Sequence, residues 1–267
     1  MNITEQFVFV HMPKTGGTFV AHVLRDIYTP EWLRSRFLRQ LLFKVANSVI
    51  VKFTIEAPHI ELKKHAPCRE IPSRYAHLPI VSCMRNPLDW YVSNYRFQYW
   101  KREPEHYPGL KDNPRWPDLD FEYFLYLSNH DWIKKMNPGL NVNPRLGRLT
   151  TLFIQFYCKR PAWVLTQQTS DDTMFEIVIE NMFPVHFLET SKLNDELYGF
   201  LIRHGYSDRQ ISFIKTLPPI SPPGARNSEE HWETFYTPEL IQEVLERDGI
   251  LFRLFPEYTN TVIGKEK

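Results

Sequence analysis

Residues 7–18 read FVFVHMPKTGGT, and this stretch decides the fold class. The apolar run Phe7–Val10 is typical of a strand that is buried on both faces of a parallel sheet. After Thr18, apolar residues recur at helical spacing as far as Ile27, and Pro30 ends that pattern. The sequence therefore predicts a strand, a glycine-containing loop and a helix within residues 5–30.

The loop after this strand carries groups that suit an anion. Ligands of open α/β sheets bind beyond the carboxyl ends of the strands. Gly16 and Gly17 let backbone N–H groups approach a ligand closely, and the N-terminus of the following helix favours negative charge. Lys14 adds a mobile positive charge, and Thr15 and Thr18 add hydroxyl donors. We therefore expect a phosphate or sulfate site here, and a glycine turn beside a solvated lysine is the plainer alternative.

A second strand pattern occupies Pro79–Met84 within the segment 79–100, and it leads directly into Arg85. Three helix-start signals follow: Asn86, Pro87 and Asp89. Ser93 lies eight residues after Arg85, in the predicted helix. A guanidinium can fork a phosphate while a hydroxyl donates to it from the helix, so this junction is a second candidate anion site. An ordinary strand–turn–helix junction is the alternative.

Strands and helices alternate along the rest of the chain. A third strand is predicted at residues 185–188 and another at 49–54. Helices are predicted over residues 31–48, 87–100, 119–135, 145–158, 192–204 and 238–249. This alternation predicts an α/β fold in one domain, residues 1–267, with a central, mainly parallel sheet flanked by helices in three layers.

Composition excludes several classes of protein. Hydrophobic residues make up 43% of the 267 and charged residues 24%, which is ordinary for a globular chain and excludes a disordered one. Lys+Arg number 32 and Asp+Glu 31, so net charge gives no reason to expect nucleic-acid binding. The cysteines, Cys68, Cys83 and Cys158, form no zinc or disulfide pattern. With neither a membrane-length apolar run nor a secretory leader pattern, we expect a cytoplasmic protein.

Residues 13–18 do not form a Walker A motif, because Lys14 and Thr15 precede the glycine pair. PKTGGT after a hydrophobic strand instead resembles the 5′-phosphosulfate-binding loop of sulfotransferases that use 3′-phosphoadenosine-5′-phosphosulfate (PAPS). The resemblance implies a P-loop-like fold. It also implies that PAPS is bound by Lys14, Thr15, Gly16, Gly17 and Thr18.

The segment around Arg85 and Ser93 resembles the 3′-phosphate-binding motif of the same family, with these two residues at the phosphate-contacting positions. More weakly, Phe187–Leu193 resembles the family's later strand and helix cap. The segment 226–228 also resembles the family's cofactor-closing loop, with Arg226, Asn227 and Ser228 at its positions. Residues 31–58 and 101–180 match no motif, and we expect acceptor recognition there.

The resemblance implies transfer of a sulfuryl group from PAPS to a hydroxyl, or an amine, of a carbohydrate or small-metabolite acceptor, leaving PAP. Lys14 is expected at the leaving bridge oxygen, with no metal, since the sequence has no dedicated carboxylate cluster. His65 resembles a His-Ala segment of carbohydrate-type members and titrates near neutrality, so it is the expected general base. A surface histidine is the alternative, and His59 and Glu56 are the reserve bases.

Two other functions stay open. A nucleotide-dependent kinase of the P-loop class is disfavoured by the order of the loop residues and by the lack of a clear Walker B acid. A catalytically silent nucleotide-binding scaffold would keep Lys14 and Arg85 and lack a working base. The basic helix at 31–48 could meet a membrane surface or an anionic acceptor, or pack on the core with a solvated face.

Overall fold

A computed structural model describes residues 1–29, 60–107, 109–218 and 231–259. The chain divides into two compact units: unit 1 comprises residues 1–84 and 184–220, and unit 2 comprises residues 85–183 and 221–267. Unit 1 is discontinuous, because its last strand and the helices after it follow the whole of residues 85–183. The helix predicted at 31–48 and the strand at 49–54 lie outside the described residues, and the single domain stays a prediction.

Unit 1 contains a mixed sheet in the strand order β3-β1-β2-β4-β5. The strands are β1 (Asn2–Ile3), β2 (Val8–Val10), β3 (Ile60–Glu61), β4 (Ile80–Met84) and β5 (Val185–Glu189). β2 and β4 are parallel, as are β4 and β5, whereas β1 runs antiparallel to β2 and β3. The predicted α/β fold with a parallel sheet centre is confirmed, and the sheet gains a short antiparallel edge that the sequence patterns did not predict.

The parallel register brings three strand ends to one edge of the sheet. Val10 pairs with Ser82, whose hydroxyl donates to the Val10 carbonyl over 2.6 Å. β4 and β5 pair along their full length and end together at Met84 and Glu189. The loop that opens at His11 therefore begins beside the end of β4, which is the position where α/β sheets bind ligands.

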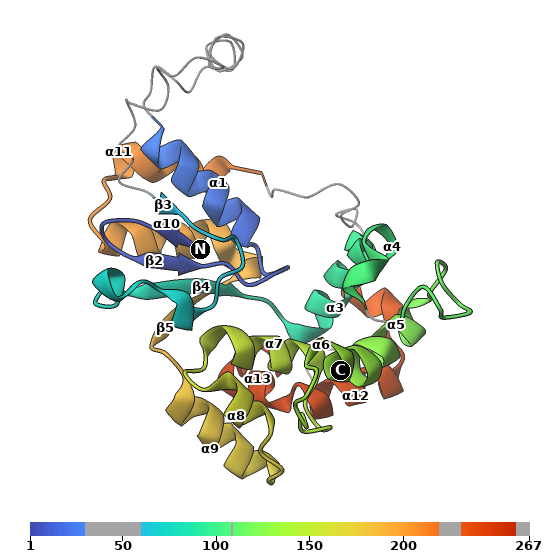
Figure 1. The fold of residues 1–267 in the computed structure, drawn as a ribbon. Helices are drawn as coiled ribbons and strands as arrows, with labels where there is room; N and C mark the ends of the chain where they lie inside the picture. The colour runs from blue at the N-terminus through green and yellow to red at the C-terminus, as the bar shows by residue number, and fades with distance from the viewer. Residues whose placement is uncertain (30–59, 108, 219–230, 260–267) are drawn as a thin grey trace, which may run out of the picture. The chain divides into compact units, whose positions relative to one another are not determined.

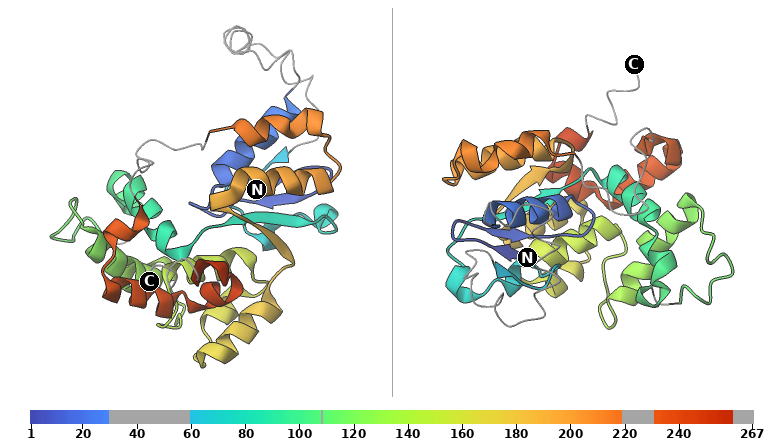
Figure 2. Two further views of the ribbon diagram at one scale, coloured as in Figure 1. Left: turned by 180° about the vertical axis from the view of Figure 1, so that it is seen from behind. Right: turned by 90° about the horizontal axis from the view of Figure 1, so that it is seen from above.

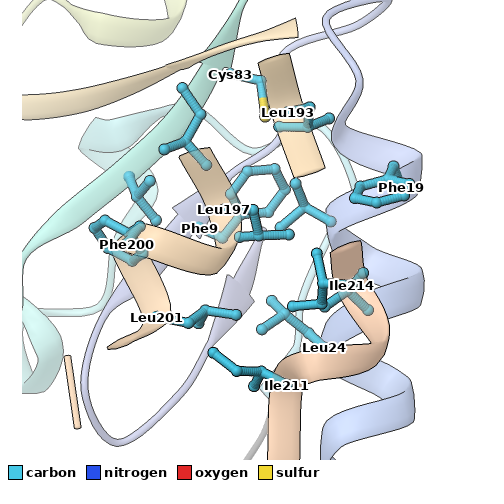
Figure 3. Close-up of a cluster of buried hydrophobic side chains, with 14 of the residues drawn as sticks. Phe9, Phe19, Leu24, Cys83, Leu193, Leu197, Phe200, Leu201, Ile211 and Ile214 are labelled. Atoms are coloured by element: carbon cyan, nitrogen blue, oxygen red, sulfur yellow. The ribbon is translucent and has the colours of Figure 1, made fainter. Parts of the chain in front are cut away.

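Three helices of unit 1 cover one face of this sheet: α1 (Gly17–Tyr28), α10 (Leu193–Arg203) and α11 (Asp208–Ile211) (Figure 1; Figure 2). Side chains from these helices and from β2 and β4 form one buried cluster, which Figure 3 shows. Phe7 meets Phe200 of α10 edge to face, with ring centroids 5.1 Å apart. Burying a side chain of this size stabilises a fold by roughly 1.5–3 kcal/mol. The cluster thus fixes α1, and with it the loop before α1, against the sheet.

Unit 2 is helical in its described residues. Its helices are α3 (Pro87–Phe97), α4 (Tyr99–Arg102), α5 (Phe121–Leu127), α6 (Ile133–Met136), α7 (Arg148–Tyr157), α8 (Pro161–Leu165), α9 (Asp171–Asn181), α12 (Pro238–Arg247) and α13 (Gly249–Leu254). A π-helical turn, Ser128–Trp132, joins α5 to α6. Among the described residues of both units, no helix combines the length and the apolar character that crossing a membrane requires.

The helices predicted at 119–135, 145–158 and 192–204 are confirmed. The helix predicted from residue 87 ends at Phe97 instead of residue 100, because Gln98 takes a left-handed backbone conformation with φ of 50°. The last predicted helix is two helices, α12 and α13, with Asp248 as the joint.

Candidate functional site

The loop between β2 and α1 is built by two residues with left-handed backbone. Lys14 has φ of 67° and Gly16 has φ of 92°. Gly16 caps α1 without a side chain, and the first turn of α1 holds no acidic residue. The first N–H groups of the helix are thereby left to face the loop, where they and the helix dipole favour an anion.

Gly17 is required by the close approach of His11. A Cβ added at Gly17 would lie 2.1 Å from Cδ2 of His11, well inside contact distance. The His11 ring is buried, and burial, reinforced by the neighbouring His65, lowers its pKa to about 3. His11 is therefore neutral in ordinary buffers and supports the start of α1 as a packed side chain.

Two threonines hold the loop in place. The buried Thr15 hydroxyl donates to the carbonyl of Met12 over 2.9 Å. The Thr190 hydroxyl, just after β5, lies 2.8 Å from the carbonyl of Thr15 and 2.8 Å from that of Met84. The Thr15 hydroxyl thus stabilises the loop in this structure, and the binding of a ligand by Thr15 stays a prediction. The patterns missed the bridging role of Thr190, whose one signal is its place directly after a strand.

His65 lies against the start of the same loop. Its Nδ1 is 2.9 Å from the backbone carbonyl of His11, and the two imidazole rings are 4.8 Å apart. A carbonyl only accepts, so Nδ1 carries the proton and Nε2 is left as the basic nitrogen. Partial burial lowers the pKa of His65, which keeps the ring neutral near pH 7. The reserve bases Glu56 and His59 lie outside the described residues.

Unit 2 holds the second candidate site at the start of α3. The Nε of Arg85 donates to Oδ2 of Asp89 over 2.6 Å, and its Nη1 donates to Oγ of Ser93 over 2.9 Å. The side chain of Asn86 accepts from the N–H of Leu88, so the predicted cap is confirmed. The structure brings Arg85 and Ser93 together as the motif predicts. Sequence reasoning missed Asp89 as the partner of Arg85, although the spacing of four residues is a signal for such a pair.

The C-terminal part of unit 2 packs on α3. The Tyr236 hydroxyl donates to the carbonyl of Leu88 over 2.9 Å, and the guanidinium carbon of Arg96 lies 5.5 Å from the ring of Phe235. These contacts anchor residues 235 and 236 to α3, the helix that carries Ser93. The segment that resembles a cofactor-closing loop, Arg226–Ser228, precedes them in the chain and lies outside the described residues.

One surface group of the described residues could offer three metal ligands close together. These are Glu103, Glu105 and His106, whose ligand atoms lie within 4.8 Å of one another and which are all exposed. None of the three belongs to either anion motif, so neither candidate site depends on them.

Comparison with known proteins gives a likeness in structure and none in sequence. No protein-family model matches the chain, and no curated protein matches it in sequence. Among solved structures, mouse sulfotransferase SULT7A1 in complex with PAP is similar to this chain with a TM-score of 0.43 and 15% sequence identity. The likeness covers 93% of this chain and 84% of that one.

Proposed function

We propose that this protein is a PAPS-dependent sulfotransferase that moves a sulfuryl group to a hydroxyl or amine of a carbohydrate or small metabolite. One observation carries the proposal: the two motifs follow two neighbouring parallel strands, β2 and β4, which end at the same edge of the sheet. Val10 leads into the loop and Met84 leads into Arg85. We base the proposal on these residues and not on the structural likeness.

The loop of unit 1 is proposed to bind the 5′-phosphosulfate. In the reaction the S–O bond to the 5′-phosphate breaks, a new S–O or S–N bond to the acceptor forms, and PAP leaves with the bridging oxygen. By analogy with phosphoryl transfer, positioning and electrostatics supply most of the acceleration. Lys14 is assigned to the charge that develops on the bridging oxygen. The N–H groups of Thr15, Gly16, Gly17 and Thr18 are assigned to the non-bridging oxygens.

Arg85 and Ser93 are proposed to bind the 3′-phosphate. Asp89 holds the Arg85 guanidinium through Nε, so Nη1 and the Ser93 hydroxyl are already next to each other before a ligand arrives. A guanidinium held in this way loses little rotamer entropy when it pairs with a phosphate. Since Lys14 and Arg85 supply the positive charge, we expect binding of PAP without a metal ion.

His65 is proposed as the general base. Its Nδ1–H is occupied by the His11 carbonyl, so Nε2 is the nitrogen that would take the acceptor proton as the new bond to sulfur forms. The lowered pKa of His65 supports this role, because a base must be unprotonated when the acceptor binds. Acceptor recognition is proposed for residues 101–180 of unit 2 and for 31–58.

The first experiment separates this proposal from its two rivals by ligand binding. Thermal shift of the purified chain is measured with PAP, ATP and GTP, each with and without Mg²⁺. A sulfotransferase is expected to be stabilised by PAP without Mg²⁺, whereas stabilisation by ATP that needs Mg²⁺ would favour a kinase. Arg85→Ala is the control, since it should abolish the PAP effect.

The second experiment detects transfer. Radiolabelled PAPS is incubated with panels of carbohydrates, phenols and amines, and sulfated products are identified by mass spectrometry. Transfer that disappears in Lys14→Ala supports the proposal. Tight PAP binding with neither transfer to any panel nor slow hydrolysis of PAPS would favour the silent scaffold.

A further inference from the structure

Arg148, the first residue of α7, is a buried cation with unused donors. Only 9% of its surface is exposed, and its Nε and Nη1 are fully enclosed with no hydrogen-bond partner among the described residues. A buried guanidinium ordinarily pairs with a carboxylate or another acceptor, because removing the charge from water costs several kcal/mol. The donors of Arg148 are therefore an exception that needs a physical reason.

Aromatic rings supply part of the compensation. The guanidinium carbon of Arg148 lies 5.3 Å from the ring centre of Tyr107 and 5.2 Å from that of Trp132. These two rings are 4.5 Å apart and tilted by 60° to each other. A desolvated cation–π contact is worth about 2 kcal/mol. Rings over its faces leave the in-plane N–H donors of a guanidinium without an acceptor.

The backbone beside Arg148 is unusual as well. Trp132 ends the π-helical turn Ser128–Trp132, and Asn129 of the same turn accepts from the backbone N–H of Arg148 over 3.0 Å. The hydroxyl of Ser128, in the same turn, is also buried and has no hydrogen-bond partner in the part of the chain that the structure describes. π-turns are rare within helices and are frequently found at functional sites. Two independent features, the unused donors and the π-turn, thus coincide at one place in unit 2.

The buried Asp248 side chain, which contacts Thr150 two residues after Arg148, has other partners. Oδ1 of Asp248 accepts from the N–H and the hydroxyl of Thr150 over 2.8 and 2.7 Å, and its Oδ2 lies 2.8 Å from the hydroxyl of Tyr91. This carboxylate is thus committed to contacts other than the Arg148 donors.

We propose that Arg148 binds the oxyanion of an organic ligand, through Nε and Nη1, beside the buried rings of Tyr107 and Trp132. Guanidinium nitrogens are donors only, and their planar arrangement matches a carboxylate, a sulfate ester or a phosphate ester. Tyr107 and Trp132 are 4% and 1% exposed, so a ligand reaches the donors only when a side chain of this group moves aside, and Tyr107 directly follows the short 3-10 turn Pro104–His106. This binding site does not depend on the proposed transferase activity.

The test observes Arg148 itself. In ¹⁵N-labelled full-length protein, the Nε–H resonance of Arg148 is followed while acetate, benzoate, phenyl sulfate, phenyl phosphate, sulfate or phosphate is added at constant ionic strength. We expect a saturable shift with at least one organic anion. Arg148→Lys should weaken binding about tenfold or more, because a point charge replaces the planar fork. Arg145→Gln is the matched control, since Arg145 is exposed and should leave binding unchanged.

The arms of the experiment identify the ligand class. Saturation by acetate and benzoate alone assigns a carboxylate, and saturation by the phenyl esters assigns a sulfate or phosphate ester. Shifts with inorganic sulfate or phosphate only would contradict an organic ligand. A resonance that no anion moves would overturn the proposal and leave Arg148 as a structural cation–π contact. If Arg148→Lys does not fold, the titration of the unsubstituted protein still decides.

Discussion

The two candidate anion sites are held by different kinds of group. In unit 1 the loop is shaped by backbone: Lys14 and Gly16 are left-handed, and Gly17 has no room for a side chain beside His11. In unit 2 the site is made of side chains, with Arg85 fixed by Asp89 and in contact with Ser93. The geometry of the backbone site is set by the fold of the loop. The charge of the side-chain site is set by single residues.

This difference predicts a division of labour. Unit 1 also holds His65, so substitutions there should reduce turnover more than binding. Substitutions in the side-chain site of unit 2 should reduce PAP binding more than turnover. The predictions below test this division, from the largest expected effect to the smallest.

His65→Ala should lower kcat by about 10²–10⁴-fold while PAP binding is retained, because a general base acts in the transition state. In the unsubstituted protein the rate should fall with acid at a lower pH than an ordinary histidine would give, since burial lowers the pKa of His65. The pH–rate profile and PAP titration measure both effects. His59→Ala and Glu56→Gln are the matched controls, and near-normal turnover of His65→Ala with collapse of either control would move the role to that residue.

Lys14→Ala should lower kcat by about 10²–10³-fold and PAP affinity by much less, because charge on the leaving oxygen develops only during transfer. Lys14→Gly is the control for backbone strain, since glycine adopts the positive φ of this position without cost. Equal losses of turnover in the two variants would attribute the effect to the charge. Equal losses of kcat and of PAP affinity would mean that Lys14 binds the cofactor before transfer and does not act specifically in the transition state.

Arg85→Ala should weaken PAP binding about 100-fold, because a charged contact to the 3′-phosphate is lost and Asp89 is left without its partner. Isothermal titration with PAP measures the change, and turnover at saturating PAPS should fall far less. Arg96→Ala is the control on the same helix, where Arg96 packs over Phe235. Unchanged affinity in Arg85→Ala would remove the 3′-phosphate from this site.

One buried group in each unit, His11 and Asp248, should make stability depend on pH, with opposite signs. Burial lowers the pKa of His11 from 6.5 to about 3, so acid protonates this histidine in the unfolded chain first. The free energy of unfolding should therefore fall by about 3 kcal/mol between about pH 7 and pH 4. Burial raises the pKa of Asp248 from 3.8 to about 6, so the same fall in pH adds about 2 kcal/mol to the free energy of unfolding.

Urea unfolding of His11→Asn and Asp248→Asn, each against the unsubstituted protein, separates these two contributions. As the pH falls, the unsubstituted protein should lose stability relative to the first variant and gain it relative to the second. Differences that stay constant with pH would show that neither group is buried as the structure has it.

Ser93→Ala should have the smallest effect, a loss of PAP affinity of about fivefold, since one hydroxyl contact of about 1 kcal/mol disappears while Arg85 and Asp89 remain paired. Titration with PAP measures it, and Ser93→Thr should restore most of the affinity. A loss as large as that of Arg85→Ala would mean that Ser93 orients the guanidinium as well as the phosphate.

Local sequence predicted the elements that local rules govern. The strand predicted at 79–84, observed as Ile80–Met84, the cap at Asn86 and the cap at Thr237 are set by side chains a few residues apart, and all three are confirmed. The edge strands β1 and β3 are two residues each and have no pattern of their own. Their pairing depends on a neighbour elsewhere in the chain, so no window of sequence contains the signal.

The sequence by itself determined which residues carry charge and where the strands end: Lys14 in a glycine loop, and Arg85 with Ser93 at a capped helix. Only the tertiary structure decided how these groups are used. It directed the Thr15 hydroxyl to Met12, joined the loop to β4 through Thr190, and turned Nε2 of His65 into its basic nitrogen. The physical reason is that a hydrogen bond between residues distant in sequence depends on the packing of the whole sheet, which local spacing does not encode.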